Sequence, residues 1–214
     1  MEFLPITISI LALILSGVTL WLSHLRRGVI KMTRPTVIFF GPDGGKSGGP
    51  KLFLRTLLYS TGNKGVVLEH MFARLERNET RQNFNIWVYG DKELSRGSGL
   101  FVGPEGMAAN HHFLAPSDLD SFEFKAGDYR LSLFAKAVGQ DHGHELASVS
   151  LKITPDEAKQ LLVPNTGIYF DWGPDSNQYH SKIDVRNELD LDPMRLLEAI
   201  SNPPADTVSS SEGN

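Results

Sequence analysis

The sequence of 214 residues contains no cysteine, and this absence excludes several kinds of chemistry. Disulfide bonds, thiolate metal sites and a cysteine nucleophile are all ruled out, and a reducing compartment is compatible with the composition. The His-Glu-x-x-His signature of helical zinc sites is also missing. We recognise no complete catalytic set and no cofactor motif, so the sequence leaves enzyme activity open and favours a non-enzymatic protein.

After the first 34 positions, acidic residues outnumber basic ones. The whole chain has 21 Lys and Arg and 25 Asp and Glu, and residues 1–34 contain four of the basic residues and one acid, Glu2. The remaining 17 basic and 24 acidic residues give a formal charge of −7. An acidic domain is repelled by phosphate backbones and by anionic lipid. We therefore expect no nucleic-acid binding, and a domain that stands off the membrane surface.

Charge is absent from residues 3–22, which read FLPITISILALILSGVTLWL. At about 1.5 Å per helical residue this stretch spans roughly 30 Å, the thickness of the hydrocarbon core of a bilayer. The pattern predicts a transmembrane anchor over residues 1–24, which makes the lipid bilayer itself a partner. A cleaved signal peptide and a buried core helix are alternatives, although the chain begins with Met-Glu-Phe and no small-x-small cleavage site is evident.

Basic residues follow the apolar stretch and do not precede it. Trp21 marks its C-terminal edge, and Arg26, Arg27, Lys31 and Arg34 follow within a juxtamembrane linker over residues 25–35. Lys and Arg accumulate on the cytoplasmic side of inner or plasma membranes, and indoles favour the headgroup level. The sequence therefore predicts a single-pass protein whose C-terminal domain is cytoplasmic.

Alternation with a period of two residues dominates the rest of the chain. It predicts antiparallel strands, and the fold class is all-β, a sandwich of seven to nine strands over residues 36–154. Val66–Arg77 is ambiguous between strand and helix, and we predict a strand because a tight connection precedes it. In the segment 84–89, Phe84, Ile86 and Val88 alternate with Asn85, Trp87 and Tyr89. The other predicted strands are 36–40, 51–60, 100–102, 111–114, 122–124, 129–137 and 147–153.

The C-terminal part predicts a mixed extension over residues 155–200. Thr154 followed by Pro155 is typical of a helix start, and this short helix should end near Leu162. Extended pieces are expected at residues 167–172 and 179–185, and a second short helix from Asp192 to about Ile200. Residues 201–214 are small and polar, so we expect a disordered tail.

One segment resembles a known family. The strand before residue 60, the polar connection Ser60-Thr61-Gly62-Asn63-Lys64-Gly65 and the strand after it are similar to the B-to-C part of immunoglobulin-like sandwiches. The resemblance implies an immunoglobulin-like architecture, without the Cys-Trp-Cys framework, and it implies nothing about activity.

Acidic residues stand in three similar turns. Gly-Pro-Asp-Gly, Gly-Pro-Glu-Gly and Gly-Pro-Asp-Ser each follow an apolar or aromatic run, and Pro presets the second position of such turns. If the three turns meet at one pole, Asp43, Glu105, Asp171 and Asp175 could bind Ca²⁺ or a basic partner. Plain turns that end strands are the simpler interpretation.

Histidines occur in two pairs, His111 with His112 and His142 with His144. In an all-β chain such pairs are similar to the metal-binding jelly rolls of the cupin kind, in which imidazoles and a carboxylate hold a metal ion. Glu145 follows His144 directly and does not match the spacing of that carboxylate. Solvated loop histidines are the alternative interpretation.

These observations lead to three functional hypotheses. The first is a membrane-anchored, non-enzymatic β-sandwich that serves as a cytoplasmic interaction or regulatory module for a protein partner. The second is a membrane-tethered cupin-like enzyme that uses the four histidines to bind metal. The third is an extracytoplasmic ligand-binding sandwich, which requires the opposite topology.

Overall fold

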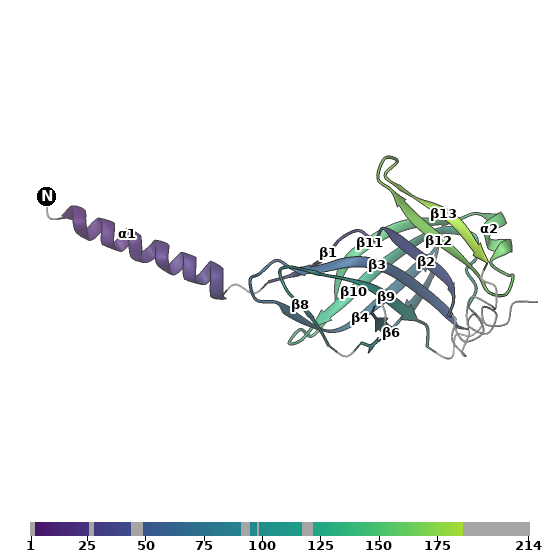
Figure 1. Cartoon of the computed structure of the whole chain (residues 1–214), viewed down its shortest axis with the longest axis horizontal. Helices are drawn as coiled ribbons and strands as arrows, with labels where there is room; N and C mark the ends of the chain where they lie inside the picture. The colour runs from purple at the N-terminus through teal and green to yellow at the C-terminus, as the bar shows by residue number, and fades with distance from the viewer. Residues whose placement is uncertain are drawn as a thin grey trace, which may run out of the picture.

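The computed structural model describes residues 3–25, 28–43, 49–90, 95–97, 99–116 and 122–185. The chain begins with an apolar helix and continues into a domain of two antiparallel β-sheets packed face to face (Figure 1). Helix α1 covers Phe3–Leu20 and passes into a π-helical turn, η1, at Trp21–Leu25. Within the described residues, one helix, Phe3–Ser23, is long and apolar enough to cross a membrane. Its apolar side chains are not buried against the rest of the chain.

The larger sheet has eight strands, and its central strand is β3, as its apolar sequence predicted. Strand β1 pairs with the last residues of β3, and β2 pairs with the earlier residues of that strand. All neighbouring strands of this sheet run antiparallel. In spatial order the strands are β13 (Gln178–Val185), β12 (Thr166–Gly173), β2 (Val37–Pro42), β3 (Pro50–Ser60), β9 (Met107–Leu114), β6 (Ile86–Tyr89) and β7 (Ser95–Arg96), with β1 (Ile30–Met32) on β3.

The smaller sheet has five strands and is also antiparallel throughout. Its centre is the long pair β10 and β4, and the ambiguous segment Val66–Arg77 is confirmed as strand β4. The strands are β11 (His144–Ile153), β10 (Gly127–Ala137), β4 (Val66–Arg77) and β5 (Thr80–Phe84), with β8 (Leu100–Val102) pairing the start of β4.

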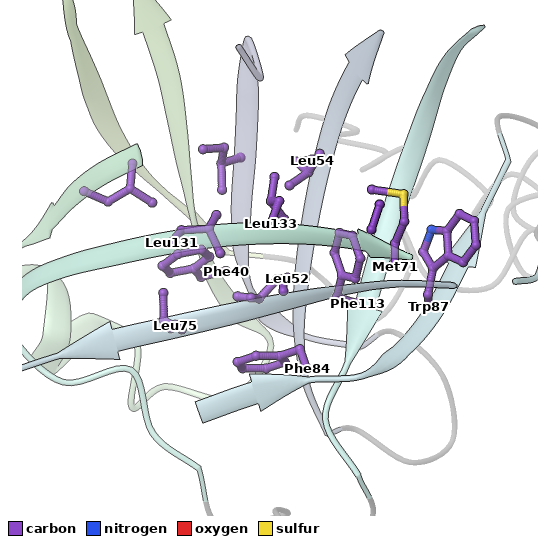
Figure 2. Packing of buried hydrophobic residues seen from close by; sticks show 14 of the residues in the cluster. Phe40, Leu52, Leu54, Met71, Leu75, Phe84, Trp87, Phe113, Leu131 and Leu133 are labelled. Atoms are coloured by element: carbon purple, nitrogen blue, oxygen red, sulfur yellow. The ribbon is translucent and has the colours of Figure 1, made fainter. Parts of the chain in front are cut away.

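The core lies between the two sheets and is built from their inward-facing residues. Figure 2 shows side chains of the larger sheet, such as Phe40 and Phe113, against side chains of the smaller one, such as Met71 and Leu131. Each of these four residues is fully buried. Removing this apolar area from water is the main stabilising contribution to such a sandwich.

The segment 84–89 corrects a sequence prediction. The alternation of Phe84, Ile86 and Val88 with Asn85, Trp87 and Tyr89 predicts one strand, but the chain crosses from the smaller sheet to the larger one at Asn85, so that β5 and β6 belong to different sheets. Phe84 is buried before the crossing, whereas after it Trp87 is buried and Ile86 and Val88 are only half-buried. A change of sheet reverses the inward face, and local alternation cannot reveal it.

Other predicted boundaries also differ. Residues 122–124 form no strand, although Phe124 still packs into the core. Strand β1 lies inside the predicted linker, and β12 and β13 belong to the larger sheet, so the sheets extend on both sides of residues 36–154.

The first predicted C-terminal helix is present as α2, Pro155–Gln160. Thr154 caps it, since Glu157 N donates to Thr154 Oγ1 while the Glu157 carboxylate accepts from Thr154 N. Burial would raise the pKa of the Glu157 carboxyl, but hydrogen bonds from Ser181 and Thr154 outweigh it and lower that pKa. The second predicted helix at 192–200 and the tail at 201–214 lie outside the described residues, and the immunoglobulin-like topology stays a prediction.

Candidate functional site

A groove of about 860 Å³ lies between the smaller sheet and the edge of the larger one. Its floor and walls come from strands β10, β11 and β13, from the ends of β4 and β12, and from Arg34 in the segment before β2. The lining residues are Arg34, Glu76, Asn78, Asp128, Tyr129, Arg130, Ser148, Val149, Ser150, Leu151, Lys152, Trp172, Asn177, Gln178 and Tyr179.

Both strands that flank the groove are edge strands. Strand β11 ends the order of the five-stranded sheet, and β13 ends the order of the eight-stranded sheet. Among the described residues each pairs on one side only, with β10 and with β12 respectively. An edge strand presents backbone donors and acceptors that are free to pair with another extended chain.

One wall of the groove is aromatic. The ring of Trp172 lies 5.1 Å from that of Tyr179 in an edge-on arrangement, and the Arg34 guanidinium lies 3.9 Å above the Trp172 ring. Tyr179 Oη donates a hydrogen bond of 2.7 Å to Pro35 O, which fixes the ring against the segment before β2. Burial raises the pKa of Tyr179 to about 12, against the opposing effect of the Arg34 charge, so the phenol stays neutral and keeps donating.

The opposite wall carries charges of both signs. Two cations, Arg130 and Lys152, lie beside two carboxylates, Glu76 and Asp128, as cross-strand neighbours, and Arg34 adds a third cation from the aromatic wall. Glu76 already accepts from Arg81 Nε at 2.7 Å, while Arg130 Nε donates to Ser148 Oγ at 2.9 Å and is held along β11. The polar atoms that remain available at the rim are therefore weighted toward positive charge.

Burial also affects Tyr129, which lies beneath the groove. Its hydroxyl donates a 2.6 Å hydrogen bond to Lys125 O. Burial raises the pKa of Tyr129, and this exceeds the lowering effects of the Arg77 charge and of the bond to Lys125. The groove thus contains two neutral phenols, neither suited to act as a base near pH 7.

The predicted acidic cluster does not form. Asp43 follows the end of β2 and binds Lys51 Nζ at 3.0 Å, whereas Asp171 lies opposite Val37 at the start of β2. Six residues at about 3.3 Å each separate these two positions by roughly 20 Å. Glu105 lies in the turn between β8 and β9, beside the far end of β3, and Asp175 lies in the turn between β12 and β13.

The four histidines lie on different surfaces. His111 faces the core, where its Nδ1 accepts from Trp87 Nε1 at 3.2 Å, and His112 points to the other face of β9, 5.0 Å from the Phe53 ring. His142 and His144 are exposed in the other sheet, at the β10–β11 connection. Within the described ranges, no group of three His, Cys, Asp or Glu residues could hold a metal ion.

A serine and a histidine that the sequence analysis did not single out lie together in the β12–β13 hairpin. Ser176 Oγ is 2.8 Å from His180 Nε2, and Asp171 stands opposite His180 in the strand register. All three residues are exposed and lie outside the lining of the groove. Ser176 Oγ also donates to Gly173 O at 3.3 Å, so this contact closes the turn.

The predicted basic flank divides into two parts. Lys31 is exposed on β1, and Trp21 is 54% exposed at the start of η1. Arg34 instead belongs to the groove, through its contact with Trp172. Arg26 and Arg27 lie outside the described residues.

Sequence reasoning found the aromatic run at 169–172 but not the groove. Five aromatic residues stand in or near the predicted strands, Trp87, Tyr89, Tyr169, Phe170 and Trp172, and the structure buries two of them, Trp87 and Phe170, in the core. Only Trp172 of this set lines the groove. Tyr179 lies opposite Trp172 in the β12–β13 hairpin, whereas Arg34 is 138 positions away in the sequence, so no local pattern joins Arg34 to this pair.

Comparison with known proteins gives no family. No protein family and no curated protein matches the sequence. Among solved structures, a sporulation control protein, Spo0M from Bacillus subtilis, is 10% identical over 75% of this chain and 76% of its own, with a TM-score of 0.33. A family 123 glycoside hydrolase from Clostridium perfringens is 8% identical over 60% of this chain, with a TM-score of 0.34.

This chain spans only 27% of the length of that hydrolase structure. The CooA pilin subunit from enterotoxigenic Escherichia coli is 13% identical over 56% of this chain and 100% of its own, with a TM-score of 0.27. Likenesses this distant carry no argument about function, which therefore rests on the site itself.

Proposed function

We propose that this chain is a single-pass membrane protein whose β-sandwich is a cytoplasmic, non-enzymatic interaction module. In this proposal the groove between β11 and β13 binds an extended segment of a partner protein. The observation that carries it is the position of the groove, which lies between two strands that each pair on one side only. The apolar helix Phe3–Ser23 supports the anchor, and the basic residues after it support the cytoplasmic topology.

Strand addition is the binding mode that fits these edges. A partner segment laid along β11 would gain main-chain hydrogen bonds, which give affinity for any extended sequence. Selectivity would then come from side-chain pockets that alternate along the segment. In β11, Ser148 and Ser150 are exposed between half-buried Val149 and buried Leu151, so the strand offers a polar rim over an apolar base.

The lining defines the chemistry of the partner segment. Trp172 and Tyr179 form a half-buried aromatic wall suited to a large apolar side chain. Lys152 and Arg130 lie across from that wall and suit a carboxylate nearby in the segment. The expected ligand is an extended peptide with an aromatic or aliphatic residue close to an acidic one.

The binding test uses the full chain in lipid nanodiscs and peptides selected on it from a random library. Trp172→Ala and Lys152→Glu should each weaken the selected peptides by about tenfold or more, because both remove a side chain of the groove. Lys182→Glu is the matched control, since Lys182 is exposed on β13 outside the groove. Hydrogen exchange should slow at residues 148–152 when the peptide binds.

Equal binding to the wild-type chain, Trp172→Ala and Lys152→Glu would refute the groove as the site. Protection confined to another strand would refute it equally. Reversal of the Lys152→Glu loss by a peptide whose acidic residue is replaced with lysine would establish the charge contact directly.

Topology has an independent test in the sequon Asn78-Glu79-Thr80, at the exposed turn between β4 and β5. Synthesis of the full chain in microsomes able to glycosylate should leave Asn78 unmodified if the domain stays on the cytoplasmic side. A mass shift that disappears in Asn78→Gln would place the domain on the other side and overturn the cytoplasmic assignment.

A further inference from the structure

Large exposed apolar side chains are unevenly distributed over the β domain. Among the described residues outside α1 and η1 there are seven of them. Three, Leu162, Val163 and Val185, follow α2 or end β13. The other four lie at the end of the sandwich that joins α1, and we call them the proximal patch: Val29 (58% exposed), Val67 (42%), Phe101 (61%) and Val138 (64%).

Three residues of the proximal patch, Val67, Phe101 and Val138, are neighbours across adjacent chain segments. Val67 of β4 lies directly opposite Phe101 of β8, and Val138 N donates a 2.9 Å hydrogen bond to Val67 O. The Phe101 ring lies against Gly65, where a Cβ atom would collide with it. Glycine at position 65 therefore lets the ring lie flat over the backbone while its outer face stays exposed.

Figure 1 shows that α1 reaches the domain beside β1 and β8, and the connection there is short. Gly28 packs on the backbone of Gly62, where a Cβ atom would be 2.6 Å from Gly62 N. Val29 is fixed by two bonds of 3.0 Å, one from Val29 N to Thr61 Oγ1 and one from Thr61 N to Val29 O. The domain thus begins at Gly28, three residues after the end of η1 at Leu25.

Three residues reach at most about 11 Å when fully extended. The polar headgroup layer on one side of a bilayer is roughly 5 to 8 Å thick. If α1 spans the membrane and Trp21 lies at its interface, so short a connection keeps the loop that carries Thr61 within roughly 10 Å of the headgroups. The strands next to that loop, β8 and the start of β4, carry the exposed apolar side chains.

Charge at this end has both signs, because Glu105 and Asp141 are exposed there together with basic residues. Arg26, Arg27 and Lys31 precede or begin the domain, and Lys64 is exposed in the loop beside Thr61. Glu69 is paired with Lys136 at 3.1 Å. The formal charge of −7 after residue 34 describes the domain as a whole, whereas attraction to anionic headgroups falls off within about 10 Å and depends on the charges near the surface.

We propose that the β domain rests on the membrane surface through the proximal patch, with Phe101 and Val138 inserted among the lipid headgroups. This inference rests on the membrane anchor of the proposed function and replaces the expectation that the domain stands off the bilayer. Docking at this end fixes the orientation of the sandwich, so that the groove between β11 and β13 faces the partner in a constant direction.

The absence of cysteine permits a clean test with single spin labels. Phe101→Cys, Val138→Cys and the control Leu162→Cys are each labelled in the full chain, reconstituted in vesicles of phosphatidylcholine and phosphatidylglycerol. Leu162 is the matched control because it is as exposed as Val138 but lies after α2. The ratio of collision with oxygen to collision with a water-soluble nickel chelate should be about threefold higher at the two patch positions, because oxygen partitions into the apolar interface.

A label at Leu13→Cys in the middle of α1 separates failure of this inference from failure of the anchor. If position 13 lies in lipid while positions 101 and 138 match position 162, the docking is refuted and the anchor stands. If position 13 is itself accessible to the chelate, the anchor is refuted, and the docking with it. Dipolar broadening between labels at position 101, with low collision rates for both reagents, would overturn the lipid contact in favour of a second copy of this chain.

Discussion

The two ends of the sandwich depart from ordinary surface composition in opposite directions. At the end joined to α1, the proximal patch exposes large apolar side chains, with Phe101 61% exposed. At the other end, after β2 and before β3, the side chains of Lys51 and Asp43 are only 12% and 26% exposed. One end shows apolar surface to its surroundings, and the other removes ionisable groups from water.

The ionisable groups at the distal end have a partner within the fold, whereas the exposed apolar side chains at the proximal end have none that the fold explains. Lys51 Nζ lies 3.0 Å from Asp43 Oδ1, so the burial at the distal end is balanced by an internal partner. The side chains of the proximal patch are 42 to 64% exposed. Their exposed apolar area contributes no stability while it faces water. Its explanation therefore lies outside the chain, and a lipid surface three residues from η1 provides one.

The largest predicted effect removes the internal partner at the distal end. Lys51→Met keeps the length of the side chain but leaves the partly buried Asp43 carboxylate without its cation, and it should lower the free energy of unfolding by about 1 to 3 kcal/mol. Urea unfolding of the full chain in a mild detergent, followed by tryptophan fluorescence, measures this change.

The matched control is Lys136→Met, because Lys136 pairs with Glu69 at 3.1 Å with both side chains at least one-third exposed. That substitution should change the free energy of unfolding by no more than about 0.5 kcal/mol. Equal losses in the two variants would show that the distal pair is an ordinary surface contact and would remove one side of the comparison.

A smaller effect is expected from pH at the same end. Burial, and secondly the Lys51 charge, lower the pKa of His112 from 6.5 to about 4, while Asp43 opposes them. Between these two values the unfolded chain binds a proton that the folded chain does not, so stability is full above about pH 6.5 and falls as the pH drops toward 4. After allowance for partial exposure, the loss should be on the order of 1 to 2 kcal/mol.

His112→Phe removes this titration and keeps a ring beside Phe53, so its free energy of unfolding should depend less steeply on pH between 6.5 and 4. Denaturant unfolding at half-unit pH steps measures the difference. His142→Phe is the control, because it changes an exposed histidine of the β10–β11 connection and should keep the wild-type slope. Identical slopes for the wild-type chain and His112→Phe would contradict the prediction.

Much of the fold could be predicted because one sheet face is buried along each long strand. Period-two alternation predicted β10 and β11, and the continuous apolar run identified β3 as central. The crossing at Asn85 could not be predicted, since both halves of the segment alternate and only tertiary pairing decides which face turns inward. Strand β1 was missed because three residues carry too little pattern.

The groove and the proximal patch could not be predicted from the sequence, for a shared reason. Each is assembled from short contributions of distant segments, such as Arg34 with Trp172, or Val67 with Phe101 and Val138. A valine in a strand has the same local sequence signal whether it lies in the core or at an exposed end. Only the register between strands separates the two cases.

The smallest predicted effect tests whether folding needs the proximal patch at all. Val138→Ala and Val102→Ala make the same chemical change on the two sides of β4, at a position that is 64% exposed and at one that is fully buried. Val102→Ala should lower the free energy of unfolding by about 2 kcal/mol through lost burial and a cavity, whereas Val138→Ala should change it by no more than about 0.5 kcal/mol. Urea unfolding in detergent, without a bilayer, measures both. A loss at Val138 as large as that at Val102 would mean that the fold itself requires the patch, and the contrast between the two ends would need no lipid surface to explain it.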